Sequence, residues 1–187
     1  MKRILIALAI AGSAATASGQ GTVVFDNVYN GGMPNAPFFE SDGVTKLSGS
    51  QFMAELLAGP NAYSLAAIAM TGFASGSQAG YFFGGEQTIS SVAGGATAWV
   101  QVDVWNTASG VSFAQAQGSG LPDSWWQSSL FSVQTGNRLT GVGFTPPAPL
   151  TGLGTSPLYL NSVPEPSTLS MAALGGALAL FYVRYRK

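Results

Sequence analysis

The sequence predicts an all-β protein, an antiparallel β-sandwich or jelly-roll-like domain with an additional segment at each end. Three observations predict this fold. Short apolar runs alternate with clusters of Gly, Asn, Ser and Pro, 25 of the 187 residues are glycine, and only 8 % are charged, compared with about 25 % in an average protein. Turn residues at such short intervals are typical of many short antiparallel strands. The low charge argues against a cytosolic helical bundle and against a highly charged disordered chain.

The body of the chain, residues 20–160, is expected to contain about seven to nine strands. The apolar runs that predict them are 22–28, 51–58, 81–83, 88–92, 96–105, 111–116, 130–133 and 157–160. Residues 52–57 also fit a single short helix, because so short an apolar run agrees with both periodicities, but we expect a strand. Gly84 and Gly85 are expected to form a turn, and the proline-containing stretch 141–154 suits a loop or a crossover.

The clearest strand is predicted at 96–105. Alternate residues of a strand point to opposite faces. One face is therefore expected to enter the core with Ala98, Val100, Val102 and Val104. The other face carries Trp99, Gln101, Asp103 and Trp105. Two indoles beside polar groups suit a sugar-binding surface, but the tryptophans lie about 20 Å apart along the strand. We expect loops or a second layer to cover them instead.

The composition excludes several kinds of site. The chain contains no His and no Cys, so Ser-His-Asp and Cys-His groupings, disulfides and the common zinc, haem and iron–sulfur ligands other than carboxylates are excluded. The sequence also contains no nucleophile elbow, no Walker A motif and no dinucleotide-binding fingerprint. We therefore expect no enzyme activity, no cofactor and no metal site. A glycosidase pair among the scattered carboxylates is a remote alternative, and the acidic turn at 40–43 is expected to be solvated rather than calcium-binding.

The charges are concentrated at the two ends of the chain. The terminal basic residues are Lys2, Arg3, Arg184, Arg186 and Lys187. Only Lys46 and Arg138 lie between them, in a region that holds seven of the eight acidic residues. Phosphate binding needs clustered Lys and Arg. Nucleic acid is therefore not expected as a partner.

Residues 1–19 have the layout of a secretory signal peptide. A basic start is followed by the apolar stretch 4–11 and then by small residues. Eight apolar residues are too few to span a hydrocarbon layer of about 30 Å. Signal peptidase accepts small side chains, so cleavage is expected after Ala17, with Ala15 at the −3 position, or after Gly19, with Ala17 at that position.

The C-terminal end has the features of a short membrane-spanning helix. Residues 169–183 carry no charge, and as a helix they would cover about 22 Å, or about 28 Å when extended to 167–185. A helix that is apolar all round is typical of a membrane span. The basic residues Arg184, Arg186 and Lys187 would remain on the cytoplasmic side, so the body of the protein would face outward. Just before this helix stand Val163, Pro164, Glu165 and Pro166, which the two prolines hold extended.

The motif, apolar helix and basic tail, in this order at the end of the chain, resemble the PEP-CTERM sorting signal of exported bacterial proteins. The resemblance covers about the last 25 residues. It implies that Val163, Pro164, Glu165 and Pro166 form the motif read by a membrane-bound exosortase, and that Arg184, Arg186 and Lys187 form the stop signal. It also implies anchoring in the inner membrane before processing, and later residence at the envelope surface or in the matrix of a Gram-negative bacterium. The signal implies an export route but no activity.

These observations predict three segments: a signal peptide (1–19), an exported all-β domain (20–160) and a sorting signal (161–187). The leading interpretation is a non-enzymatic component of the cell surface or extracellular matrix. The alternative is a carbohydrate-binding module that holds exopolysaccharide. Its contacts would be Trp125 and Trp126, which are expected in a loop beside Asp123, or the outward face of the strand 96–105.

Overall fold

The computed structural model describes residues 19–29, 34–139 and 143–161. Most of the regular secondary structure in these residues is strand, in mainly antiparallel sheets with little helix, which confirms the predicted all-β class. The strands are β1 (Gln20–Asp26), β2 (Phe38–Phe39), β3 (Gly49–Gly59), β4 (Ala66–Phe73), β5 (Phe83–Ala93), β6 (Thr97–Asn106), β7 (Trp125–Gln127), β8 (Phe131–Gln134), β9 (Gly136–Asn137), β10 (Ala148–Pro149) and β11 (Leu158–Tyr159). The helical elements are α1 (Phe113–Gly118) and the 3-10 turns η1 (Gly76–Gln78) and η2 (Thr151–Leu153). The predicted signal peptide, except Gly19, and the predicted helix at 169–183 lie outside the described residues.

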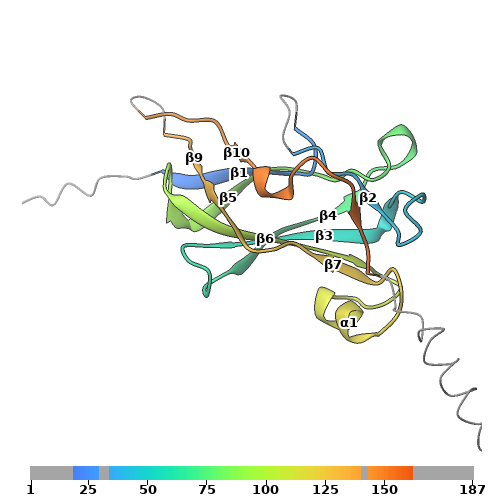
Figure 1. Ribbon diagram of the computed structural model, residues 1–187. Helices are drawn as coiled ribbons and strands as arrows, with labels where there is room; N and C mark the ends of the chain where they lie inside the picture. Colours follow the sequence, from blue (N-terminus) through green and yellow to red (C-terminus); the bar gives the residue numbers. More distant parts are fainter. Residues whose placement is uncertain (1–18, 30–33, 140–142, 162–187) are drawn as a thin grey trace, which may run out of the picture.

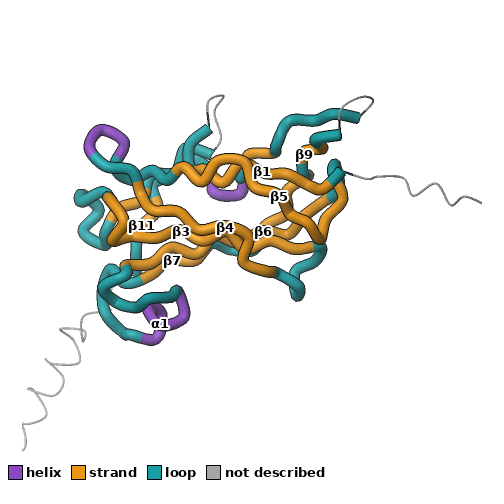
Figure 2. The backbone as a smooth tube through the Cα atoms, turned by 180° about the vertical axis from the view of Figure 1, so that it is seen from behind, coloured by secondary structure: helices purple, strands orange, loops and turns teal. Residues whose placement is uncertain are grey.

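The strands form two larger sheets that face each other. One sheet has the order β4-β3-β6-β7, with β8 also paired to β6, and the other has the order β10-β1-β5, with β9 also paired to β1. Figure 1 shows β1 above the layer that contains β3, β4 and β6. A small third pair, β2 and β11, is parallel, as is the pairing of β1 with β10. Figure 2, seen from behind, places α1 beside β7, outside the two layers.

One hydrophobic core fills the space between the two sheets. The four inward residues predicted for the clearest strand, Ala98, Val100, Val102 and Val104, are all fully buried. Phenylalanines from both layers meet them: Phe25 and Phe82 have ring centroids 4.9 Å apart, and Phe73 and Phe82 pack edge to face at 5.5 Å. Edge-to-face aromatic packing adds to the free energy gained by burying apolar area.

The run 52–57 forms a strand, as expected, at the centre of β3. It pairs with β4 on one side and with β6 on the other, so its backbone is bonded to both neighbours. The apolar run therefore fits a strand inside a sheet and not the alternative helix. Strand β4 is an element that the sequence analysis missed. Its residues are half exposed along most of the strand, and small and apolar residues follow one another without a clear alternation.

The strand predicted at 111–116 is wrong, because this segment forms α1. Ser112 precedes the helix, and its side chain accepts a hydrogen bond from the Gln115 amide at 3.4 Å. The Gln115 side chain reaches back to accept from the Val111 amide at 3.0 Å. This reciprocal capping of a Ser-x-x-Gln sequence starts the helix.

The turn predicted at Gly84 and Gly85 is also wrong, since β5 continues through both residues. Asp26 pairs with Phe83 and Val24 with Glu86, so β5 has one extra residue in a bulge. Gly85 adopts a φ of 69°, which favours glycine. A Cβ on Gly84 would lie 2.4 Å from the Phe25 ring, so no larger residue fits there without a shift.

The predicted loop at 141–154 is only partly a loop. Residues 141–142 lie outside the described residues, while β10 and η2 occupy part of the remainder. Pro149 pairs with Val24 in the short parallel ladder between β10 and β1. Proline is accommodated there because β10 is an edge strand with β1 on one side.

Asn27, directly after β1, connects three segments of the chain. Its side chain is fully buried and donates to the carbonyls of Ala36 at 2.8 Å and Gly80 at 2.9 Å. Its oxygen accepts from the Phe82 amide at 2.7 Å. A buried amide that satisfies all these backbone groups fixes the end of β1 against the start of β5 and the segment before β2.

We predict that Asn27→Ala lowers the free energy of unfolding of the segment 18–165 by at least about 2 kcal/mol. The substitution leaves two buried backbone groups without a partner, the Ala36 carbonyl and the Phe82 amide, because the Gly80 carbonyl still accepts from the Phe38 amide. Each unsatisfied group costs about 1 to 3 kcal/mol. Equilibrium urea denaturation followed by tryptophan fluorescence measures the change.

The matched control is Asn61→Ala. Asn61 is exposed and its side chain accepts only from the Tyr63 amide, among the described residues. Its loss is expected to change stability by less than about 1 kcal/mol. Equal effects of the two substitutions would contradict the assigned role of Asn27.

Candidate functional site

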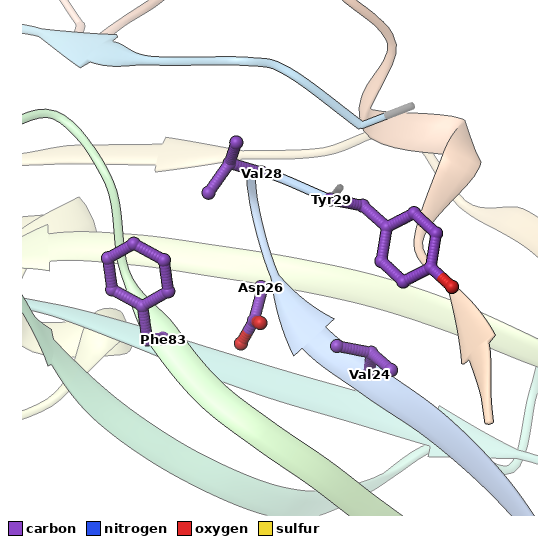
Figure 3. A pocket seen from close by; sticks show the side chains of 5 residues that line it. All are labelled: Val24, Asp26, Val28, Tyr29 and Phe83. Carbon is purple, nitrogen blue, oxygen red and sulfur yellow. The ribbon is translucent and has the colours of Figure 1, made fainter. Parts of the chain in front are cut away.

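A pocket of about 290 Å³ opens on the outer side of β1, where the strand ends. Figure 3 shows its lining: Val24, Asp26, Val28, Tyr29 and Phe83. The first three are alternate residues and therefore share the outward face of the strand. The rings of Tyr29 and Phe83 lie on opposite sides of Asp26 in this view, and they are 38 % and 44 % exposed. The pocket thus combines two accessible aromatic rings with a carboxylate.

The Asp26 carboxylate is held in place by the bulge. Its Oδ1 accepts a hydrogen bond from the Gly85 amide at 2.9 Å. On β5, the residue after Gly85 is Glu86, which pairs with Val24 of β1. Glu86 forms an ion pair with Arg138. The sequence analysis missed this pocket, because Tyr29 and Phe83 are 54 positions apart and only the bulge brings them to one face.

The paired tryptophans Trp125 and Trp126 belong to β7 and not to a loop. Trp126 is opposite Val104 and packs edge to face on Phe38 at 4.9 Å, on the core side. Trp125 points to the outer side, where it packs on Phe113 of α1 at 5.8 Å. The structure therefore separates the two predicted contact residues on opposite faces of the sheet.

The outward tryptophans of β6 differ in exposure. Trp105 is only 2 % exposed, as expected for a covered side chain, and Trp125 is its register partner. Trp99 is half-buried and lies opposite Ser132 of β8, at the other end of β6. The two indoles of this strand therefore do not form one platform.

Glu55 and Asp103 form a pair of carboxylates directly opposite each other on β3 and β6. Asp103 is 5 % exposed and accepts from the Gln127 side chain at 3.0 Å. Burial raises the pKa of Asp103 to about 6, and the charge of Glu55 adds to the increase, while the Gln127 hydrogen bond opposes it. Burial also raises the pKa of Glu55. The Gln127 side chain occupies one of the two carboxylate oxygens of Asp103.

The acidic turn at 40–43 is closed by its own hydrogen bonds. Asp42 accepts from the Val44 and Thr45 amides, both at 2.8 Å, and from the Thr45 hydroxyl. The Thr45 hydroxyl is the main reason why the pKa of Asp42 is lowered. No group of three or more His, Cys, Asp or Glu side chains able to hold a metal ion is found in residues 19–29, 34–139 and 143–161.

Asn161, the last residue that the structure describes, is bonded to the segment 121–125. The Asn161 side-chain oxygen accepts from the amides of Ser124 at 2.9 Å and Trp125 at 2.8 Å, and its amide group donates to the Leu121 carbonyl at 3.1 Å. The backbone of Asn161 adds two further bonds, accepting from the Asp123 amide and donating to the Trp125 carbonyl. The sorting residues Val163, Pro164, Glu165 and Pro166 and the basic residues Arg184, Arg186 and Lys187 lie outside the described residues. Within the described part of the chain, every helix is too short or too polar to cross a membrane.

At the other end, Gly19 belongs to the folded body. Its carbonyl accepts a hydrogen bond from the Gly94 amide at 2.5 Å. A Cβ on Gly19 would lie 2.4 Å from the Asn137 side-chain oxygen, so the chain passes very close to β9. The other two predicted cleavage residues, Ala15 and Ala17, lie outside the described residues.

A family model described as the PEP-CTERM protein-sorting motif matches residues 162–187. No curated protein and no solved structure matches the chain. The resemblance found in the sequence is therefore confirmed. The chain carries a PEP-CTERM sorting motif, which identifies it as an exported protein addressed to exosortase-type processing. The matched segment begins directly after Asn161.

We predict that the free energy of unfolding falls by about 1 to 2 kcal/mol as the pH rises from 4.5 to 7, and that Asp103→Asn removes most of this dependence. The folded state holds the Asp103 proton up to a pKa of about 6, whereas an unfolded Asp loses it near 3.8. Protonation is therefore linked to folding in this window, and stability decreases as the proton is lost. Urea denaturation at several pH values measures the slope.

Asp42→Asn is the control for this titration. The pKa of Asp42 is lowered below its ordinary value, so it lies under the window from pH 4.5 to 7. The Asp42→Asn variant is expected to retain the slope of the unmodified protein. An unchanged slope in Asp103→Asn would show that another group titrates.

We further predict that signal peptidase cleaves after Ala17, so that the mature chain begins at Ser18. Cleavage after Gly19 would remove Gly19, which directly precedes β1 and whose carbonyl accepts a hydrogen bond from the Gly94 amide. N-terminal sequencing of the mature protein gives the answer. A first residue of Gln20 would contradict this assignment.

Proposed function

We propose that the chain delivers a non-enzymatic β-sandwich domain to the cell surface or extracellular matrix of a Gram-negative bacterium, where it is a structural or adhesive component. The observation that carries this proposal is the position of Asn161. The folded body is bonded through Asn161, and the sorting motif begins at the next residue. Processing at the motif would therefore leave in place the contacts that Asn161 makes with the body.

The composition of the body is compatible with an oxidising environment outside the cytoplasm. It contains neither His nor Cys, and its two basic residues are outnumbered by seven acidic ones. The domain is held by apolar packing and backbone pairing between strands, which do not depend on redox conditions. Such a domain tolerates both oxidising and reducing surroundings.

The arrangement of the carboxylates favours a non-enzymatic role. Glu55 and Asp103 are an acidic pair that the strands bring directly opposite each other, and Asp103 is buried and accepts a hydrogen bond from Gln127. The raised pKa of Asp103 has a structural cause, since burial is its largest contribution. A raised pKa at a buried group does not by itself indicate catalysis.

The second candidate function, carbohydrate binding through tryptophan, is supported by Trp125 more than by Trp126. Both indoles are half-buried, but Trp125 lies on the outer face against α1, whereas Trp126 packs against the core. A single indole against α1 offers a small stacking surface. The candidate is tested by polysaccharide retention of Trp125→Ala, as described with the pocket below.

We predict that Glu165→Ala prevents processing of the C-terminal segment in the native host. The motif supplies a carboxylate between two prolines, and the alanine variant removes the charge while leaving both prolines in place. Intact mass and cell fractionation are the measurements. The unmodified protein should lose both ends and leave the inner membrane, whereas the variant should retain residues 166–187 and remain there.

Thr168→Ala is the control, because Thr168 is close to the motif but outside it. It is expected to be processed normally. If the unmodified protein itself keeps its C-terminal segment and stays in the inner membrane, the proposed surface or matrix role is wrong. The chain would then be an ordinary membrane-anchored protein.

A further inference from the structure

The pocket at the end of β1 has the parts that a sugar-binding subsite needs. Pyranose rings present apolar C–H faces that stack on aromatic rings, and they present hydroxyl groups that carboxylates accept from. Tyr29 and Phe83 supply rings that are 38 % and 44 % exposed, while Val24 and Val28 complete the apolar lining. Asp26 lies between the two rings (Figure 3) and supplies the acceptor.

The carboxylate of Asp26 is positioned before any ligand binds. Its Oδ1 is bonded to the Gly85 amide, and the φ of 69° at Gly85 sets the direction of that amide. The hydrogen bonds found among the described residues leave its Oδ2 available. A fixed acceptor loses little conformational entropy on binding, which favours affinity.

The size and charge of the pocket restrict the ligand. A volume of about 290 Å³ is at the lower limit of small-molecule pockets, which range from about 300 to 1,000 Å³. This volume suits one sugar unit at a time. Asp26 and the nearby Glu86, which is already paired with Arg138, make an acidic sugar unfavourable.

We infer that this pocket, formed by Val24, Asp26, Val28, Tyr29 and Phe83, is a binding subsite for one uncharged pyranose unit of a neutral polysaccharide. The site is distinct from the tryptophans of β6 and β7, which lie on the other sheet. The inference adds a ligand to the proposed surface or matrix role and rests on that role for access to extracellular polysaccharide. Binding by a single subsite is weak, and a polysaccharide with many identical units raises the apparent affinity.

The test is affinity electrophoresis of the processed protein, recovered from its host, in native gels. The gels contain a neutral polysaccharide (dextran, laminarin or galactomannan), alginate as the acidic polysaccharide, or chitosan as the amine-bearing one. Migration of the unmodified protein should be slowed by at least one neutral polysaccharide. Phe83→Ala, Tyr29→Ala and Asp26→Asn should each weaken this retardation at least about fivefold, since each loses one of the contacts.

The variants are chosen so that the fold is preserved. Asp26→Asn keeps an oxygen that accepts from Gly85, and only the charge is removed. Phe83→Leu is a second variant at its position, which keeps apolar volume in the bulge while removing the ring. Tyr63→Ala is the matched control, because Tyr63 is an aromatic residue that is 98 % exposed and does not line the pocket. It should migrate like the unmodified protein.

Several results would overturn the inference. Retardation by no neutral polysaccharide, or by alginate or chitosan alone, would show that the pocket does not bind an uncharged sugar. Retardation that survives Phe83→Leu and Asp26→Asn but is lost in Trp125→Ala would assign binding to the outer face of β7. A protein that is processed normally and reaches the surface, yet binds no polysaccharide, would overturn this inference and leave the proposed surface role intact.

Discussion

The fold depends on one buried amide, the side chain of Asn27. The domain has neither disulfides nor a buried ion pair among the described residues, so its two sheets are joined by packing and by hydrogen bonds that cross between segments. Asn27 bonds Ala36, Gly80 and Phe82, which belong to segments that are separated by up to 55 positions in the chain. An alternative packing that broke one of these hydrogen bonds would leave a buried polar group without a partner, which costs free energy. The three bonds therefore make the arrangement specific as well as stable. The end of β1 is therefore a rigid point of the fold.

The same rigid point positions the pocket. Successive side chains of a strand point to opposite faces. Asp26 and Val28 therefore face outward, while the side chain of Asn27, which lies between them in the chain, faces the core. The Phe82 amide that bonds Asn27 directly precedes Phe83, whose ring lines the pocket. The bulge at Gly85 then turns an amide toward Asp26. A structural hydrogen bond on one side of the strand thus fixes the geometry of a recognition surface on the other.

Sequence patterns predict those parts of the fold that local alternation determines. The inward side of β6 follows from strict alternation, and the sorting signal follows from contiguous residues. The strand predicted at 111–116 failed because the capping interaction of Ser112 with Gln115 outweighs the apolar content of a six-residue run. The turn predicted at Gly84 failed because glycine also permits a bulge, and only the pairing partner decides between the two. The pocket was not predictable, since its residues meet through long-range strand pairing.

The positions of the two ends of the body are consistent with a domain that is delivered intact. Gly19 is hydrogen-bonded to Gly94, which lies close to the start of β6. Asn161 is hydrogen-bonded to Trp125, and Trp125 pairs with Trp105 at the end of β6. The two ends are thus separated by the length of a strand of about ten residues, or roughly 30 Å. The contacts at each end involve different strands, so removal of one terminal segment does not disturb the contacts of the other. Asn161, which is bonded to Ser124 and Trp125, directly precedes the residues that match the sorting motif.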